Sequence, residues 1–283
     1  MKAKIRDYFA LTKPEVNLLI LMTTSAGYYL GSRGAVHLPG LVSTLLGTLL
    51  VASGTATLNQ WMERIWDGRM HRTARRPLPA RRVRPTEALV FGILLSISGA
   101  LFLYVFVTPL SSLLAASTLL SYLLIYTPLK RHTPLCTLLG AVPGAMPVLI
   151  GWAGARGSLS SQAMLLFAVL FLWQFPHFLA IALMYREDYE RAGYRMLPRF
   201  DEDSRFTRGE ILFFTAALIL TTTLPLTAWG VGYALAMLLA GGFLAYYSWR
   251  LAASASRMAA KRLVHASVIY LPVVLAILIA GKR

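Results

Sequence analysis

The chain has 283 residues, of which 57% are hydrophobic and only 14% are charged. Apolar runs of membrane-spanning length recur along it, which argues against a soluble protein and predicts one integral membrane domain, residues 1–283. The net charge of +16 does not indicate a nucleic-acid-binding protein, because the basic residues lie at the ends of the apolar runs, and the single Cys136 excludes an intrachain disulfide framework.

About nine apolar segments are long enough to cross a bilayer as helices, so the expected fold is all-α. They are predicted at 14–31, 39–60, 86–107, 110–127, 135–152, 162–184, 210–228, 230–249 and 264–280. Pro109 and Gly230 mark two very short connections, which we expect to be tight turns. The spacings Gly27-x3-Gly31 and Gly140-x3-Gly144 favour close helix packing.

The basic residues are divided unequally between the two ends of these segments. With nine spans, 24 of the 28 Lys and Arg residues fall on one side of the membrane, together with all twelve acidic residues. The other side has only Arg33, Arg156, Lys282 and Arg283. The positive-inside rule predicts that the charged side, which includes the amino terminus, is cytoplasmic and that the carboxy terminus is outside.

The end of the second span carries the first candidate site. Asn59, Glu63 and Asp67 are four residues apart, so on a helix they share one face. Two carboxylates and an amide oxygen suit Mg²⁺, which prefers few carboxylates together with substrate phosphates. Arginines that follow, including Arg72 and Arg76, have the fork geometry that binds phosphate. An ordinary charged helix end with a basic membrane-surface loop is the alternative.

A second polar stretch lies four spans later. Gln174 and His177 are three residues apart and are expected to share a helix face, and polar residues within a span are commonly functional. Glu187, Asp188 and Glu190 follow as an acidic cluster, with Asp188 close to four turns beyond Gln174 if the helix continues through Pro176. A hydrogen bond between helices for His177, and a solvated loop for the acidic cluster, are the alternatives. Two such clusters predict two Mg²⁺ ions around one diphosphate, which indicates prenyl transfer.

Four stretches of the chain resemble the UbiA-type intramembrane prenyltransferases. They are YFALTKPEV (8–16), the Asn59-Glu63-Asp67 pattern followed by MHRTARRPLPA, YTPLKRHTP with GAVPGAMPVLIGW (126–152), and WQFPHF with EDYERAGYRMLP (173–198). The last is most similar to the branch of the family that acts on haem. Three positions depart from the family pattern: Glu63 stands in place of the usual Asp, Cys136 in place of an Asn, and Arg195 in place of a Pro.

The resemblance implies a fold of about nine helices around a central apolar cavity and two substrates, farnesyl diphosphate and haem b. It implies that Asn59, Glu63 and Asp67 bind one Mg²⁺ and that Asp188 with Glu187 binds another. The residues expected to act in catalysis are Asn59, Glu63, Asp67 and Asp188. Diphosphate binding is expected from Arg72, Arg76, Lys130 and Arg131, and haem binding from Gln174 and His177.

The resemblance also implies a bacterial inner membrane location, haem A synthase or oxidase assembly proteins as partners, and no nucleic acid. Two alternatives stay open at this point. The first is a prenyltransferase whose acceptor is an aromatic quinone precursor. The second is an ion-binding transporter, which predicts carboxylates near the bilayer midplane rather than at one face.

Overall fold

The computed structural model describes residues 2–224 and 230–282. Most of these residues are in helices, and no strand occurs among them. They are α1 (Lys2–Leu11), α2 (Pro14–Gly31), α3 (Leu38–Asp67), α4 (Pro85–Phe106), α5 (Pro109–Leu120), η1 (Ser121–Tyr126), α6 (Thr127–Leu129), α7 (Cys136–Arg156), α8 (Ser161–Met184), α9 (Arg186–Arg191), η2 (Leu197–Phe200), α10 (Arg205–Thr223), α12 (Val231–Ser254) and α13 (Arg257–Gly281). The predicted all-α fold is confirmed.

The helix starts follow from local chemistry. Proline stands at the first position of α2, α4 and α5, where its missing N–H costs nothing. Thr108, Ser160 and Ser256 accept a backbone N–H of the first turn of α5, α8 and α13, respectively. These caps hold the short connections between long apolar helices.

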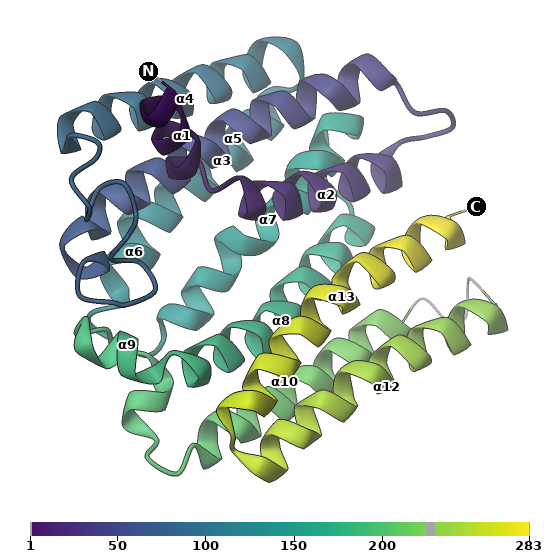
Figure 1. Cartoon of the computed structure of the whole chain (residues 1–283). Coiled ribbons are helices and arrows are strands. Elements are labelled where there is room, and N and C mark those ends of the chain that lie inside the picture. The colour runs from purple at the N-terminus through teal and green to yellow at the C-terminus, as the bar shows by residue number, and fades with distance from the viewer. Residues whose placement is uncertain (1, 225–229, 283) are drawn as a thin grey trace.

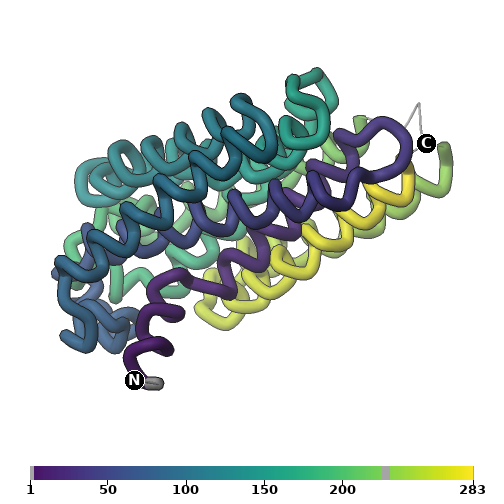
Figure 2. Tube along the Cα trace, turned by 90° about the horizontal axis from the view of Figure 1, so that it is seen from above, coloured from purple at the N-terminus to yellow at the C-terminus, as the bar shows by residue number. Residues whose placement is uncertain are grey.

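The long helices form one elongated bundle (Figure 1), and in the second view they run along most of its length (Figure 2). The amino-terminal helix α1, the 68–84 loop and α9 lie at one end, and the carboxy-terminal end of α13 lies at the other (Figure 1). The two termini thus lie at opposite ends of the bundle, and the predicted cytoplasmic location of the amino terminus stays a prediction.

Seven helices in the described part of the chain are long and apolar enough to cross a membrane. They are Leu38–Asp67, Pro85–Phe106, Pro109–Leu129, Cys136–Arg156, Ser161–Met184, Val231–Ser254 and Arg257–Gly281. The predicted spans at 14–31 and 210–228 correspond to α2 and α10. These two helices are not both long and apolar enough to be counted with the seven, so the number nine is approximate. The end of the predicted span at 210–228, and its turn to Gly230, lie outside the described residues.

The ends of two helices matter for the site: α3 is longer than its predicted span, whereas α8 ends where it was predicted to end. The second predicted span continues seven residues farther, to Asp67, so the candidate metal ligands stand on one uninterrupted helix, α3. Helix α8 continues through Pro176 but ends at Met184, and Asp188 belongs to the separate helix α9. The condition that the helix continues through Pro176 is met, but the break after Met184 means that the four-turn relation between Gln174 and Asp188 does not hold.

Glycines allow α2 and α7 to pack in backbone contact. A Cβ placed on Gly27 would lie 2.1 Å from the carbonyl oxygen of Val148, and one on Gly151 would lie 2.0 Å from that of Thr24. The predicted close packing at Gly27-x3-Gly31 is confirmed, because Gly31 lies against the backbone of Trp152. This contact fixes α2 against α7.

We expect Gly151→Ala to destabilise the protein by about 1–3 kcal/mol, because the added methyl group must separate two backbones. Gly242→Ala is the matched control, since nothing lies within 4 Å of a Cβ at this helical position. That control should be neutral or stabilising, because alanine favours a helix by about 1 kcal/mol over glycine. Thermal unfolding in detergent measures both, and equal melting temperatures for the two variants would contradict the close contact.

Candidate active site

Three polar side chains line one face of the last turns of α3. Asn59, Glu63 and Asp67 have exposed fractions of 1%, 6% and 1%, and they stand at the end of the bundle that carries the 68–84 loop. Burying two carboxylates near each other is costly unless cations and hydrogen bonds compensate them. The surrounding elements supply these partners.

Each of the three side chains meets a cationic side chain from another segment. Lys130 Nζ lies 2.9 Å from Glu63 Oε1, and one terminal nitrogen of Arg76 lies 3.0 and 2.8 Å from the two oxygens of Asp67. Lys13 Nζ donates to Asn59 Oδ1 at 3.3 Å. Three cations therefore surround two carboxylates, and this excess of positive charge favours an anionic ligand.

Lys13 is a site residue to which the sequence analysis assigned no role, although it lies in the YFALTKPEV stretch. It occupies the junction of α1 and α2 in a left-handed conformation, with φ of 50°. Two buried amides hold this junction: Gln60 donates to the carbonyl of Leu11, and Asn17 donates to that of Thr12. The only signal in the sequence was the lysine directly before Pro14, and its orientation depends on this long-range contact.

The cations have different protonation behaviour. Burial and the nearby Arg76 lower the pKa of Lys13 to about 7, although Glu63 opposes this shift. Burial also disfavours the charged form of Lys130, but the Glu63 carboxylate outweighs it and raises the pKa of Lys130 well above its usual value. The Lys130 ammonium further lies 4.4 Å from the ring centroid of Tyr126. Lys130 thus stays charged without a ligand. The charged form of Lys13 is the one that a bound anion would stabilise more.

Asp188 connects the second motif to the loop that follows the first. Its two carboxylate oxygens accept the backbone N–H groups of His71 and Arg72, at 3.2 and 3.3 Å. Arg191 forms an ion pair with the same carboxylate. Asp188 is buried, whereas its neighbour Glu187 is exposed. The structure therefore brings Asp188, but not Glu187, into contact with the 68–84 loop.

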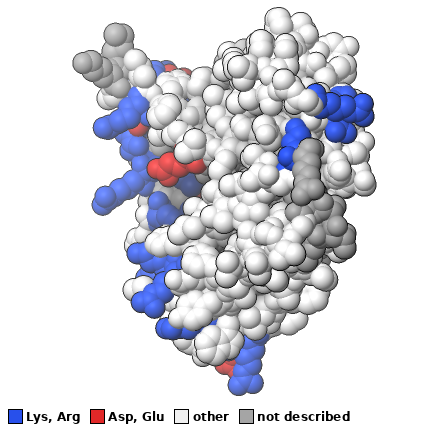
Figure 3. All heavy atoms as spheres, turned by 90° about the vertical axis from the view of Figure 1, so that its right-hand side faces the viewer, with Lys and Arg blue, Asp and Glu red and all other residues white. Residues whose placement is uncertain are grey.

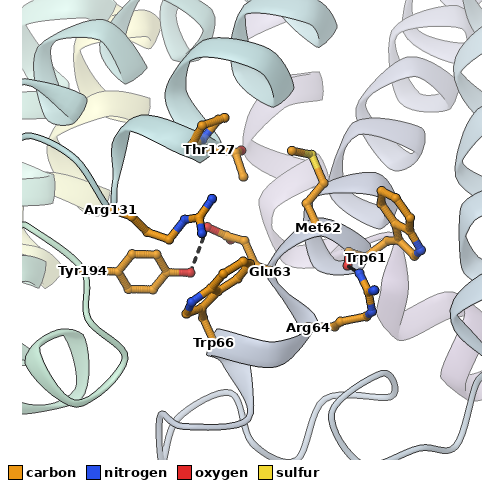
Figure 4. A pocket seen from close by; sticks show the side chains of 9 residues that line it. Trp61, Met62, Glu63, Arg64, Trp66, Thr127, Arg131 and Tyr194 are labelled. Carbon is orange, nitrogen blue, oxygen red and sulfur yellow. Dashed lines mark hydrogen bonds between the residues drawn. The ribbon is translucent and has the colours of Figure 1, made fainter.

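A cavity of about 260 Å³ opens beside Glu63 (Figure 4). Tyr194 donates a hydrogen bond of 3.0 Å to Glu63, and the guanidinium of Arg131 lies 4.0 Å from the ring centroid of Trp66. The lining residues are Trp61, Met62, Glu63, Arg64, Trp66, Thr127, Pro128, Arg131 and Tyr194. Burial and the Glu63 carboxylate raise the pKa of Tyr194, so it stays a hydrogen-bond donor.

The four basic residues predicted to bind diphosphate divide into two groups. Arg76 and Lys130 pair with the α3 carboxylates, and Arg131 lines the cavity beside them. Arg72 is more exposed, and its guanidinium lies over the rings of Tyr185 and Tyr189, at 5.0 and 5.9 Å. The first group is in place around α3, and Arg72 lies on the adjoining loop.

Gln174 and His177 contact different helices, although they are three residues apart. Gln174 donates to the carbonyl of Ala141 on α7, whereas Nδ1 of His177 lies 2.8 Å from the Ser267 hydroxyl on α13. The imidazole also stacks on Trp173, with ring centroids 4.9 Å apart. The two side chains were predicted to share a helix face, but each forms a hydrogen bond to a different neighbouring helix, Gln174 to α7 and His177 to α13.

The donor set fits Mg²⁺ only in part. Asn59, Glu63 and Asp67 offer hard oxygen atoms on one helix face, which is the chemistry that Mg²⁺ prefers. Within residues 2–224 and 230–282, however, no three His, Cys, Asp or Glu side chains come close enough to hold a metal ion by themselves. An ion held here would need further oxygens from water or from a phosphate group, as Mg²⁺ commonly takes in substrate complexes.

A buried, oxygen-rich site surrounded by basic side chains at one end of an apolar helix bundle is the arrangement expected of a membrane protein that acts on a phosphorylated substrate. Residues 20–269 match the UbiA prenyltransferase family model, and the chain belongs to this family. A protoheme IX farnesyltransferase of Solibacter usitatus is 46% identical, and the alignment covers 98% of this chain and 99% of that protein.

Solved structures have the same fold. A digeranylgeranylglyceryl phosphate synthase superposes with a TM-score of 0.81 at 18% identity, covering 100% of this chain and 99% of the other. A UbiA homologue from Archaeoglobus fulgidus bound to DMAPP and Mg²⁺ gives a TM-score of 0.70 at 14% identity, covering 96% and 98%. At these identities, the structures establish the fold alone.

We expect Asp188→Asn to loosen the 68–84 loop, because the two backbone N–H groups bind different carboxylate oxygens and the amide NH2 that replaces one of these oxygens cannot accept a hydrogen bond. The loss of one buried hydrogen bond to a charged acceptor corresponds to about 1–3 kcal/mol, so exchange at the His71 and Arg72 amides should accelerate by about tenfold. Glu187→Gln is the control and should leave this exchange unchanged. Hydrogen–deuterium exchange measures both, and similar protection in both variants would contradict the anchoring role of Asp188.

Proposed function

We propose that this protein transfers a farnesyl group from farnesyl diphosphate to a vinyl group of protohaem IX, with addition of water, to give haem O. The observation that carries this proposal is a buried cluster in which basic side chains contact the three polar groups of α3. Lys13 contacts Asn59, Lys130 contacts Glu63, and Arg76 contacts Asp67. It supports binding of a diphosphate. The 46% identity to a protoheme IX farnesyltransferase over nearly the whole chain supports protohaem as the acceptor.

In this proposal, Asn59, Glu63 and Asp67 hold Mg²⁺, which neutralises charge on the diphosphate. Lys13, Lys130 and Arg131 bind phosphate oxygens. Arg76 and Arg72 complete this positively charged end of the bundle. Asp188 holds the loop that carries Arg72. A second Mg²⁺ at Asp188 and Glu187 remains a prediction, since Asp188 here accepts hydrogen bonds from the loop.

The reaction begins when the bond between C1 of farnesyl and the diphosphate oxygen breaks and its electron pair leaves with the diphosphate. The π electrons of the porphyrin vinyl group form the new carbon–carbon bond. Water then adds to the resulting cation beside the ring and loses a proton. The surrounding apolar helices exclude bulk water, which would otherwise capture the farnesyl cation first. The ring of Tyr126, already in contact with the Lys130 ammonium, is placed to stabilise positive charge.

The two alternatives make different demands on the structure. A transporter requires ion-binding carboxylates along a path through the bilayer, but Glu63 and Asp67 are at the end of α3, beside the 68–84 loop. A quinone-precursor acceptor would leave the diphosphate site unchanged, so the acceptor must be tested directly.

The direct test is turnover of the purified protein with farnesyl diphosphate, Mg²⁺ and haem b, followed by product mass. We expect a product that carries one farnesyl group and one water, and no product when an aromatic quinone precursor replaces haem. Asp67→Asn removes a carboxylate without changing size and should lower the rate at least about 100-fold, whereas Glu63→Asp should be milder because it keeps the charge. Prenylation of the quinone precursor alone would refute the assigned acceptor, and full activity of Asp67→Asn would refute the metal site.

We further propose that His177 contacts the porphyrin, because a neutral imidazole can bind haem iron or a polar substituent. His177→Ala should weaken haem binding, measured by absorbance titration, while calorimetric binding of farnesyl diphosphate persists. Ser267→Ala is the control, since it removes the hydrogen-bond partner of His177 but keeps the imidazole. If both variants lower only the melting temperature, His177 is an interhelical hydrogen-bonding residue.

We propose that the protein is in the bacterial inner membrane with the site end in the cytoplasm, because 24 of 28 basic residues are predicted to lie on that side. Ala74→Cys and Ser158→Cys, each made with Cys136→Ala, should be labelled by an impermeant maleimide from opposite sides. Intact cells should label only position 158, and lysed cells should label both. Labelling of both positions in intact cells would contradict the orientation. Haem A synthase and oxidase assembly proteins remain the proposed partners.

A further inference from the structure

A second cavity lies where the α2–α3 and α7–α8 connections meet. It measures about 450 Å³ and is lined by Tyr28, Ser32, Arg33, Ala35, His37, Ala155, Arg156 and Ser158. The α2–α3 connection, which carries part of its lining, is at the end of the bundle away from the 68–84 loop (Figure 1). The proposed reaction uses none of these residues.

Positive charge gathers at this cavity, and none of its described lining residues is an Asp or a Glu. Arg33 and Arg156 line it, and Lys282 reaches it through hydrogen bonds to the carbonyls of Tyr29 and Ser32. None of the twelve acidic residues of the sequence falls in the connections 32–37 and 157–160 or after residue 210. In the view of this end, a small group of Lys and Arg side chains stands apart from the larger basic region along the opposite edge (Figure 3).

Part of this charge fastens the end of α2, which is its ordinary structural role. The Nε of Arg156 donates to the carbonyl of Gly31, and its guanidinium lies 5.0 Å from the ring centroid of Trp152. An arginine has two further terminal nitrogens that can donate to an anion. Arg33 is exposed and makes no hydrogen bond or ion pair with the described residues. Fastening α2 therefore does not account for all of the donors.

Neutral donors stand beside these cations. The Nδ1 atom of His37 accepts the backbone N–H of Gly40, so the neutral ring carries its proton on Nε2. The Ser32 and Ser158 side chains line the same cavity. Burial and the nearby Arg156 lower the pKa of Lys282, as expected where like charges approach with no carboxylate between them. Two arginines and a histidine thus line the cavity, and a lysine binds the backbone of its lining residue Ser32.

We propose that this cavity binds a phosphate group, and specifically the headgroup of an anionic phospholipid in the adjacent leaflet. Arginine binds phosphate oxygens through two parallel N–H donors, and the cavity offers two arginines. Two exposed apolar side chains adjoin lining residues in the sequence: Leu38, which follows His37, is 66% exposed, and Leu159, which follows Ser158, is 38% exposed. Acyl chains lie against these residues while the phosphate occupies the cavity.

The test is native mass spectrometry of the full-length protein in detergent, titrated with phosphatidylglycerol and, separately, with phosphatidylethanolamine. We expect tighter binding of phosphatidylglycerol. Arg33→Gln should weaken phosphatidylglycerol binding about fivefold, because each Lys or Arg near a membrane surface contributes a factor of about five to the affinity. The double variant Arg33→Gln with Arg156→Gln should weaken it about 25-fold. Arg257→Gln is the matched control, because Arg257 is an exposed arginine at the other end of α13.

Arg33→Gln should fold normally, so its result does not depend on the double variant. Competition by millimolar inorganic phosphate would support a phosphate site that does not require acyl chains, whereas retention of the lipid under phosphate would support recognition of the whole headgroup with its chains. Equal binding of the two lipids by the unchanged protein would overturn the proposal. So would equal losses in Arg33→Gln and Arg257→Gln.

Discussion

The ion pairs at the end of α3 are the interaction on which the rest of the site depends. Glu63 and Asp67 are almost completely buried, and Lys130 and Arg76 lie against them and compensate the cost of burying their carboxylates. Breaking such a pair by removing one partner leaves an uncompensated buried charge, which is strongly unfavourable. A ligand that brings both a metal cation and a diphosphate anion can replace both halves of each pair. We therefore propose that the cluster exchanges its internal ion pairs for a metal–diphosphate complex.

Several distant segments maintain this arrangement. The close contact between α2 and α7 fixes α2, and the buried amides of Gln60 and Asn17 hold the junction at Lys13. From the other half of the chain, Asp188 binds the loop that follows α3, and Tyr194 donates to Glu63. Motifs that are more than 100 residues apart in sequence therefore build one site. This explains why the resemblance to the family is spread over four separate stretches.

The sequence predicted the parts of this site that depend on local geometry. The i, i+4, i+8 spacing placed Asn59, Glu63 and Asp67 on one helix face, and hydropathy indicated the helices. The role of Lys13 was missed because its direction depends on a left-handed backbone and on hydrogen bonds from α2 and α3. Gln174 and His177 were expected on one face, but three residues leave them about 60° apart on a helix. That angle is enough to direct one toward α7 and the other toward α13.

The central claim is that the α3 carboxylates hold cations which the diphosphate needs. Calorimetric titration of farnesyl diphosphate, with and without Mg²⁺, into the unchanged protein and Asp67→Asn tests it most directly. The account predicts that Asp67→Asn frees Arg76, so that metal-free diphosphate binds about tenfold more tightly, while the gain from Mg²⁺ disappears. If Asp67→Asn binds metal-free diphosphate no more tightly than the unchanged protein and keeps the full gain from Mg²⁺, the account is wrong.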